Sequence, residues 1–427
     1  MNDNELMNTA TELLKQQQWK EAGTLFRQVW ENENNAYSAS RYLYCLRKGG
    51  YPSWSIKQGN KAFNQFPGNK YIKNELVWAY YDDGIKPEAS KENLYQLIES
   101  AKIILSLQPD VLPKELTVFA VIKAAKQKEK WDIVLEWCNV IKPEDLSDES
   151  IPVDGDGRTG KSKKEQWFFA KVKSLIELEL WKEARACALE AIKIYPREMN
   201  FYRFSALALA NLGEEEKAIL ELQDILLKHR EEWYIYQDLS DIYLRINQPE
   251  TAIKFACQAA LSPGEDKIKV TLYEKICQQS LLLGKLEMSA QHLELCKAIR
   301  EREGWKVKDT LQQLQAEINQ EITNQQSTFT KFEGDITKLN QICRKFWKEI
   351  LYQDIPRYCG TIESLPPNQA HGWIIDDTGN RVFFLQKELP KFLRKEKQRV
   401  SFILQESYDR KRDRKSFKAA DFQIQKP

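Results

Sequence analysis

The 427-residue sequence lacks several features that would place it in common functional classes. No apolar run approaches the ~20 residues that a membrane-spanning helix needs. The polar residues 1–14 do not contain the basic and then apolar segments of a secretory signal. The net charge is only +2, so the chain as a whole is not a polyelectrolyte. These absences predict a soluble cytoplasmic protein without a membrane partner.

Residues that build catalytic centres are scarce or scattered. The sequence has three histidines, none at ligand spacing, and its eight cysteines include no C-x-x-C pair. Cys187 and Cys257 stand at helical core positions, which is typical of small buried residues in a reduced compartment. No Ser-His-Asp, Cys-His or metal-ligand combination has a useful spacing. We therefore expect no catalytic residue, no metal site and no cofactor, and predict that the protein is not an enzyme.

What the sequence does contain is a repeat of small residues near its middle. Ala184, Ala188 and Ala191 stand at i, i+4 and i+7 and are followed by Pro196. Residues at this spacing form one narrow stripe on a helix, against which a neighbouring helix packs closely. The same offsets return at intervals of 34 residues, at Ala218, Leu222 and Ile225 and again at Ala252, Ala256 and Ala259. A period of this length indicates stacked helical hairpins.

The stripe resembles the B helix of the tetratricopeptide repeat (TPR), whose pattern is A-x-x-x-F-x-x-A-x-x-x-x-P. The resemblance implies a mainly α fold, an α-solenoid in which the A helix of each hairpin lines a concave groove. Degenerate hairpins are predicted over 1–142 and regular ones over 165–304, with Gly213 and Gly284 at turns between A and B helices. Residues 305–355 contain two further helices, which either cap the solenoid or act as a spacer.

The groove positions of this repeat family carry polar residues in the present sequence. They are Asn200, Arg203, Gln237, Asp241 and Arg245. The resemblance implies that these residues contact a protein partner. They depart from the peptide-clamp version of the family, which presents several Lys, Asn and Arg residues to a terminal carboxylate, so we do not expect that clamp. The alternative for each residue is a solvated polar face.

Residues 143–164 interrupt the helical pattern. The segment is acidic, then glycine-rich, then basic, which predicts a flexible linker or exposed loop. Gly155 to Ser162 match the phosphate-binding pattern G-x-x-x-x-G-K-S. That pattern binds phosphate when a buried strand delivers the loop to a helix N-terminus, and the preceding residues 150–153 are broken by Pro152. We interpret the match as chance, with nucleotide binding at 155–162 as the alternative.

At Pro356 the apolar period changes from helical to alternating. Five segments have a strand pattern: 358–362, 371–375, 381–385, 399–404 and 417–424. Residues 377–380 predict the hairpin turn between the second and third strands. Five short antiparallel strands favour a small β-barrel over residues 356–427.

These strands resemble the cold-shock domain, a five-stranded barrel of the OB-fold type. The motifs follow the family's order: G-T-I at 360–362, A-H-G-W-I at 370–374, V-F-F-L at 382–385, V-S-F at 400–402 and A-A-D-F at 419–422.

The cold-shock resemblance implies that single-stranded RNA or DNA stacks on the rings of His371, Trp373 and Phe383. Strand alternation places these three residues on one face. Two departures reduce the aromatic platform. Leu385 replaces a histidine of the family, and residues 364–365 are Ser and Leu where the first strand of the family has aromatic residues.

Basic residues are concentrated in the same region. Residues 356–427 contain 15 Lys and Arg against 9 Asp and Glu, a surplus of 6 that leaves residues 1–355 at −4. Two loops between strands carry the surplus, and loops of such barrels contact phosphates. The predicted phosphate contacts are Lys391, Arg394, Lys395 and Lys397 in the first loop and Arg410, Lys411 and Arg412 in the second.

Three functions are compatible with these patterns. The first is a non-enzymatic adaptor, whose solenoid binds a protein partner and whose barrel binds single-stranded RNA or DNA. The second is a scaffold for protein–protein interaction in which the barrel is another docking surface. The third is an accessory protein that binds a nucleotide at 155–162. A repeat array joined to a cold-shock-like barrel resembles the architecture of some prokaryotic accessory or genome-conflict proteins.

Overall fold

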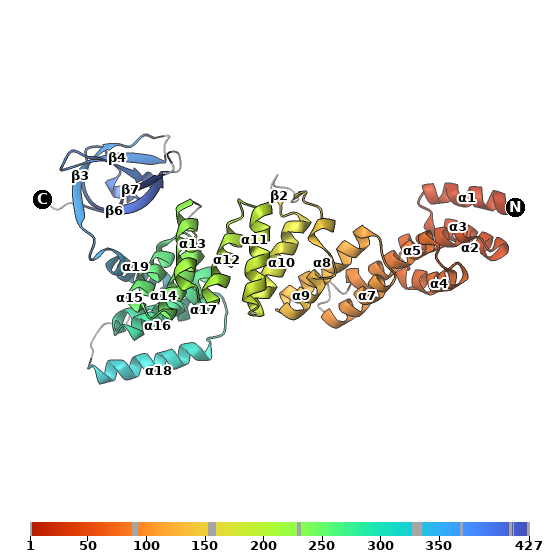
Figure 1. The fold of residues 1–427 in the computed structure, drawn as a ribbon, viewed down its shortest axis with the longest axis horizontal. Helices are drawn as coiled ribbons and strands as arrows, with labels where there is room; N and C mark the ends of the chain where they lie inside the picture. Colours follow the sequence, from red (N-terminus) through yellow and green to blue (C-terminus); the bar gives the residue numbers. More distant parts are fainter. Residues whose placement is uncertain are drawn as a thin grey trace. The chain divides into compact units, whose positions relative to one another are not determined.

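The fold is taken from a computed structural model (Figure 1). It describes residues 2–87, 93–152, 159–228, 232–326, 335–367, 370–409, 412 and 414–424. The chain divides into two compact units, Met1–Phe204 (unit 1) and Ser205–Pro427 (unit 2). The boundary falls within helix α12 (Met199–Asn211). Each unit is described by itself.

Unit 1 is a series of antiparallel helix pairs. The pairs are α1 (Asp3–Lys15) with α2 (Trp19–Glu33), α3 (Ala36–Lys48) with α4 (Pro52–Gln65), α5 (Lys70–Tyr80) with α7 (Leu94–Ser106), α8 (Val111–Gln127) with α9 (Trp131–Cys138), and α10 (Lys163–Glu177) with α11 (Trp181–Ile194). A π-helical turn, η1 (Tyr81–Ile85), follows α5. The small-residue stripe is confirmed as core, since Ala184, Ala188 and Ala191 of α11 have no exposed surface.

Local sequence explains where several of these helices begin and end. The side chains of Asn2, Asn35, Asn69, Asn93 and Ser162 accept hydrogen bonds from first-turn amides, which would otherwise lack partners. Within the described residues, seven turns between paired helices contain a residue in the left-handed backbone region, which reverses the chain. These residues are Gln17, Gly50, Glu129, Glu179, Gly213, Asn247 and Gly284. The turns predicted at Gly213 and Gly284 are thus confirmed.

The segment between α9 and α10 contains short ordered elements. A 3-10 turn, η2, covers Pro143–Asp145, and β1 (Ile151–Pro152) pairs antiparallel with β2 (Thr159–Gly160). Residues 153–158, which include the start of the phosphate-loop match, lie outside the described residues. The two helices that flank this segment are in contact: the Trp167 indole of α10 donates a 2.8 Å hydrogen bond to the Cys138 carbonyl of α9. Helices α9 and α10 therefore pack directly against each other.

The helical part of unit 2 continues the pairwise arrangement. Its helices are α13 (Glu215–Lys228), α14 (Trp233–Arg245), α15 (Pro249–Leu261), α16 (Asp266–Leu282), α17 (Leu286–Arg302), α18 (Asp309–Asn324) and α19 (Ile336–Tyr352). Helix α19 packs against α15 and α17 through the fully buried Trp347. The Trp347 indole donates a 2.7 Å hydrogen bond to Nε2 of the buried His292. Burial lowers the pKa of His292 to about 4, so its ring is neutral near pH 7.

A five-stranded antiparallel sheet ends the chain. Its strands are β3 (Arg357–Ser364), β4 (His371–Asp376), β5 (Arg381–Leu385), β6 (Arg399–Asp409) and β7 (Arg414–Ile424), in the spatial order β5-β4-β3-β6-β7. The Phe384 ring of β5 lies 5.4 Å from the Phe422 ring of β7, so the sheet curls until its two ends approach. The predicted architecture, a mainly α TPR-like solenoid followed by five short antiparallel strands, is confirmed (Figure 1).

The barrel-like domain has a core of its own and two glycines that permit close packing. Its buried residues include Ile362, Ile374 and Phe402. A Cβ on Gly372 would lie 2.4 Å from the Phe384 ring and 2.7 Å from the Ser364 carbonyl oxygen. One on Gly360 would lie 2.6 Å from a backbone oxygen of β4. Only glycine fits at these two positions, which are the glycines of the G-T-I and H-G-W-I motifs.

One carboxylate joins the barrel-like domain to α19. Asp421 on β7 contacts the Lys348 ammonium at 2.6 Å and the Arg357 guanidinium at 2.9 Å. Burial opposes ionisation of Asp421, but the two cations outweigh it and hold the pKa below its ordinary value. Asp421 therefore fixes the start of the sheet and its last strand to the preceding helix.

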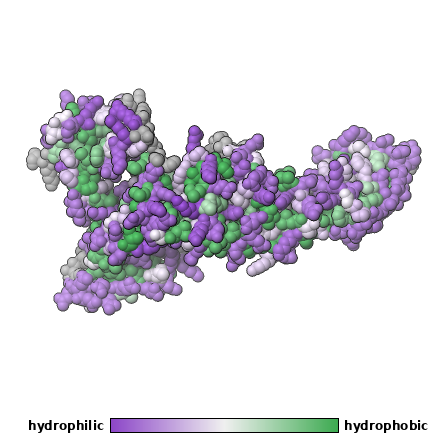
Figure 2. All heavy atoms as spheres, viewed as in Figure 1, coloured by the Kyte–Doolittle hydropathy of each residue, from purple (hydrophilic) through white to green (hydrophobic). Residues whose placement is uncertain are grey.

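The face of the molecule seen in Figure 2 is largely hydrophilic over the N-terminal helices. Within the described ranges, no helix is long and apolar enough to span a bilayer.

Candidate functional site

Three aromatic side chains gather on the outer face of the barrel-like domain. On β4, Gly372 and Ile374 are buried in the core, so the alternate residues His371 and Trp373 face outward and are partly exposed. Trp373 pairs directly with Phe383 of β5 in the antiparallel ladder. We call His371, Trp373 and Phe383 the aromatic surface.

The rings of the aromatic surface touch one another. The Phe383 centroid lies 5.7 Å from that of Trp373 and 5.6 Å from that of His371. The His371 and Trp373 rings are 6.4 Å apart and perpendicular. The predicted grouping on one face is therefore present in the structure. Because the domain core lies behind the opposite face of these strands, the three rings are not core residues.

Arg381 was not singled out from the sequence, yet it covers part of this surface. Its guanidinium carbon lies 4.5 Å from the centroid of the Trp373 ring, a cation–π distance. Its Nε also lies 2.5 Å from a carboxylate oxygen of Glu363 on β3. The ladder register could have indicated this contact, because Arg381 pairs with Ile375, two residues beyond Trp373 on the same face.

The first basic loop is tied to the domain by its backbone while its lysines stay exposed. Leu393 in η4 (Lys391–Leu393) is buried in the core, and the Lys397 amide donates a 2.8 Å hydrogen bond to the Ile362 carbonyl. The Arg394 side chain donates to the Leu389 carbonyl at 3.0 Å. Lys391, Lys395 and Lys397 are exposed, and the described residues give none of these three an ion-pair partner.

Most of the second basic loop lies outside the described residues. Arg410 and Lys411 are not among the described residues, whereas Arg412 is described and exposed. The neighbouring Arg414 and Lys415, at the start of β7, are also exposed.

The five residues predicted to line the TPR groove fall in both units. Asn200 and Arg203 lie on the part of α12 that belongs to unit 1, and the Asn200 amide group donates to Glu198 at 2.7 Å. In unit 2, Gln237, Asp241 and Arg245 follow one another at four-residue spacing on α14.

Two of the α14 side chains already have partners within unit 2. Asp241 contacts the Lys275 ammonium of α16 at 2.5 Å. Arg245 donates to the Asn211 side chain at 3.0 Å and to the Ala210 carbonyl at 3.2 Å. Both side chains thus contact neighbouring helices, while Gln237 and Asp241 are partly exposed and Arg245 is exposed.

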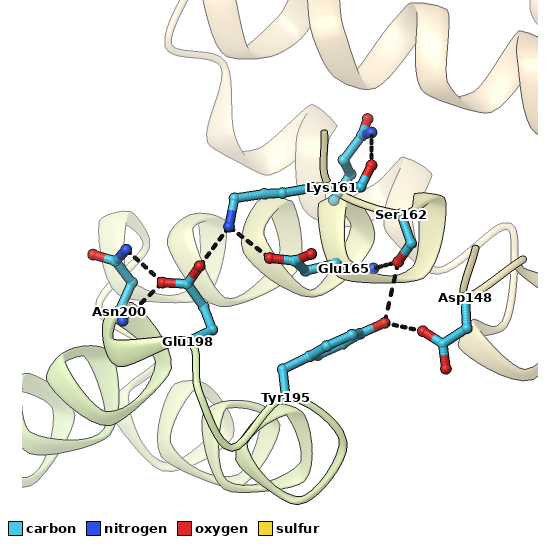
Figure 3. A network of polar contacts seen from close by, with 8 residues as sticks. Asp148, Lys161, Ser162, Glu165, Tyr195, Glu198 and Asn200 are labelled. Atoms are coloured by element: carbon cyan, nitrogen blue, oxygen red, sulfur yellow. Dashed lines mark hydrogen bonds and ion pairs between the residues drawn. The ribbon is translucent and has the colours of Figure 1, made fainter. Parts of the chain in front are cut away.

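The lysine and serine of the phosphate-loop match take part in a polar network at the start of α10 (Figure 3). Lys161 lies between Glu165 and Glu198, at 2.5 and 2.6 Å, and its ammonium stands 3.8 Å from the centroid of the Phe169 ring. Ser162 is 2% exposed and caps α10 by accepting from the Glu165 amide at 3.1 Å.

Tyr195 links this network to the segment before α10. Its hydroxyl hydrogen-bonds to Asp148 and lies 3.3 Å from the Ser162 hydroxyl (Figure 3). Burial and the Asp148 contact raise the pKa of Tyr195 to about 12. For Glu198, burial acts to raise the pKa, but hydrogen bonds from Lys161 and Asn200 hold it below its ordinary value. The network therefore consists of internal contacts that join α10 to the turn after α11.

The described residues contain no cluster of three or more His, Cys, Asp or Glu side chains that could hold a metal ion. All eight cysteines are free thiols, and seven are buried, as expected for small core residues. Burial raises the pKa of Cys45, Cys138, Cys187 and Cys277 to about 12. These thiols are therefore protonated near neutral pH.

The helix pairs define a TPR-like solenoid, and the C-terminal sheet adds a small barrel-like domain to it. A family model described as a domain of unknown function (DUF7017) matches residues 199–338, which is less than half of the chain. No curated protein matches the sequence.

Solved TPR structures align with the chain at low similarity. A tetratricopeptide repeat protein from Parabacteroides merdae is 12% identical, with 63% of this chain and 96% of that chain covered and a TM-score of 0.29. The TPR2AB domain of yeast Sti1, in a complex with pHSP90, is 16% identical, with coverages of 74% and 98% and a TM-score of 0.28. YrrB, a TPR protein with an unusual peptide-binding site, is 11% identical, with coverages of 55% and 90% and a TM-score of 0.25. The solenoid assignment rests on the helix pairs themselves rather than on these scores.

Proposed function

We propose that this protein is a non-enzymatic adaptor. Its TPR-like helix pairs bind a segment of a protein partner, and its barrel-like domain binds single-stranded RNA or DNA. The observation that carries the proposal is the aromatic surface, three mutually touching rings on the outer face of β4 and β5.

The position of these rings supports a binding role. The domain has a core of aliphatic and aromatic residues that does not include the three outer rings. Counted within the domain, β4 and β5 are its second and third strands, the pair with which OB-fold barrels bind oligonucleotides. A base stacked on an aromatic side chain contributes about 1–3 kcal/mol.

Positive charge on the same domain supports the same ligand. Lys391, Lys395 and Lys397 are exposed in a loop whose backbone is hydrogen-bonded to β3, so they are available for phosphate contacts. Such contacts release counterions, and the affinity should fall steeply with added salt. Arg381 occupies one side of Trp373, and a base that stacks there has to displace its guanidinium or lie against it.

Fluorescence anisotropy of labelled single-stranded RNA and DNA oligomers tests the proposal with the full chain at low and moderate salt. Binding should weaken with salt, and Trp373→Ala with Phe383→Ala should reduce the affinity about thirtyfold or more, as two stacking positions imply. The matched control is Phe417→Ala, which removes another exposed ring of the domain and should leave the affinity unchanged. Absence of binding by the unmodified chain would instead favour the scaffold function, with the barrel-like domain as a protein-docking surface.

A further inference from the structure

A groove in unit 1 lies between α8 and α10 and has a volume of about 470 Å³. Four lysines line it: Lys123 and Lys126 from α8, and Lys161 and Lys163 from the start of α10. Among the described residues that line the groove there is no carboxylate. The groove is therefore positively charged, although residues 1–355 as a whole carry net negative charge.

The lysines of this groove differ in how far their charge is compensated. Lys161 is paired with Glu165 and Glu198. Lys123 and Lys126 are exposed, stand about one turn apart, and have no ion-pair partner in the described part of the chain. Lys163 is partly buried, and its ammonium lies 4.6 Å from the centroid of the Phe119 ring. Three positive charges thus remain available to a ligand.

The remainder of the groove is apolar. Phe119 and Ile122 come from α8, and Phe169 and Ala170 come from α10. The Lys161 and Lys163 ammonium groups stand over the Phe169 and Phe119 rings, which holds them close to the apolar residues. A ligand that fits this lining has to present negative charge and an apolar side chain together.

We propose that the α8–α10 groove binds an extended acidic segment of a partner protein, with carboxylates near Lys123, Lys126 and Lys163 and an apolar side chain between Phe119 and Phe169. The inference rests on the protein-docking half of the proposed function and names the chemistry of that partner. A polynucleotide would stack its bases on ring faces, but the Lys161 and Lys163 ammonium groups stand over the rings of this groove, so the lining favours a peptide.

The test is anisotropy with the full chain and a fluorescein-labelled peptide built from Asp, Glu and Leu. The comparison peptide has Asn and Gln in place of Asp and Glu. The acidic peptide should bind and the amide peptide should bind far more weakly. Lys123→Glu with Lys126→Glu should weaken the acidic peptide about tenfold or more, because two attractive pairs become repulsive. Lys123→Gln with Lys126→Gln should give an intermediate loss.

The matched control is Lys182→Glu with Lys193→Glu, which makes the same charge change on exposed positions of α11 that do not line the groove. It should leave peptide binding unchanged, and circular dichroism verifies that both variants retain their helices. Equal binding of the amide peptide would overturn the acidic chemistry while leaving peptide docking intact. Binding of neither peptide would overturn both. Displacement of the peptide by an oligothymidylate would identify the groove as a polynucleotide site and overturn the inference.

Discussion

Two surfaces of this protein combine positive charge with aromatic rings, and they arrange them differently. On the barrel-like domain, three rings form a continuous surface, and among the described residues the cation over one of them is Arg381 on Trp373. The exposed Lys391, Lys395 and Lys397 of this domain stand in the loop between β5 and β6. In the α8–α10 groove, lysine ammonium groups stand directly over Phe119 and Phe169. On the barrel-like domain the rings are the partly exposed feature. In the groove the charges available to a ligand are those of Lys123, Lys126 and Lys163, because Lys161 is paired with two carboxylates.

We propose different ligands for these two surfaces on the basis of this difference in arrangement. A flat base needs an uncovered ring face, and a partly exposed sheet surface provides it. A carboxylate needs an ammonium group held in place, and the Phe119 ring provides that support for Lys163. We therefore propose nucleic acid as the ligand of β4 and β5, and an acidic peptide as the ligand of the groove between α8 and α10.

The largest expected effect comes from removing one surface altogether. Gly372→Ala places a methyl group 2.4 Å from the Phe384 ring, so β4 has to move away from its neighbours. We expect the barrel-like domain to lose about 3 kcal/mol of stability and the chain to lose oligonucleotide binding, while acidic peptide binding persists. Urea unfolding followed by tryptophan fluorescence measures the loss. Thr361→Ala, on the outer face of β3, is the control and should have little effect.

Mild acid should separate the stabilities of the two units without any substitution. His292 of unit 2 has a pKa of about 4 in the folded protein, whereas an unfolded histidine titrates near 6.5. The unfolded state therefore binds the additional proton, and stability falls as the pH drops from about 6.5 to 4, by up to about 3 kcal/mol. Unit 1 contains no histidine.

Thermal unfolding between pH 7 and 5 should thus show unit 2 losing stability first. Peptide binding by unit 1 should persist over the same range, because Asp and Glu remain largely ionised at pH 5. His292→Gln is the comparison, since it cannot bind the proton. A pH profile of unit 2 that is unchanged by this substitution would contradict the assignment to His292.

Weakening the attachment of the barrel-like domain to α19 should cause a smaller loss of stability. Asp421→Asn removes the charge that meets Lys348 and Arg357, and we expect a loss of about 1–2 kcal/mol because both cations are partly exposed. The folded-state pKa of Asp421 is lowered, so its contribution is complete above the unfolded pKa of about 4 and disappears at lower pH. Urea unfolding at pH 7 and at acidic pH measures both effects.

The control for Asp421 is Asp377→Asn, which breaks an exposed ion pair with Arg399 and should change stability by less than about 0.5 kcal/mol. Oligonucleotide affinity should be unchanged in both variants, because neither residue belongs to the aromatic surface. A large loss of affinity in Asp421→Asn alone would show that α19 contributes to the binding surface.

The smallest effect concerns the cation on Trp373. Arg381→Ala uncovers the indole, and a base no longer competes with a contact worth about 0.5–1 kcal/mol. Oligonucleotide affinity should therefore rise about two- to fivefold. Arg399→Ala removes a charge from β6 without uncovering a ring and should not raise the affinity. A decrease in Arg381→Ala greater than in the control would make Arg381 a ligand contact instead.

The features that could be predicted from the sequence are those in which residue types repeat at the period of a helix or a strand. The stripe of Ala184, Ala188 and Ala191 indicated helix pairs because a helix repeats every 3.6 residues. Alternation placed His371, Trp373 and Phe383 on one face because a strand repeats every two residues. The left-handed turns at Glu129 and Glu179 had no such signal, since glutamate has no preference for that backbone region.

Contacts between distant segments were the features that the sequence did not reveal. Lys126 and Lys163 line one groove only because α8 and α10 lie side by side, with α9 and the intervening segment between them in the chain. Lys161 matched a phosphate-binding pattern, whereas its partners Glu165 and Glu198 come from α10 and from the turn after α11. Arg381 of β5 contacts Trp373 of β4, and the sequence of neither strand alone specifies how the two strands are aligned.

One crossed titration tests the account most directly. Labelled oligonucleotide and labelled acidic peptide are each titrated with the unmodified chain, with Trp373→Ala plus Phe383→Ala, and with Lys123→Glu plus Lys126→Glu. The account predicts that each double variant loses its own ligand and keeps the other. Loss of both ligands in one variant, or of neither in both, would contradict the presence of two separate surfaces with different ligands.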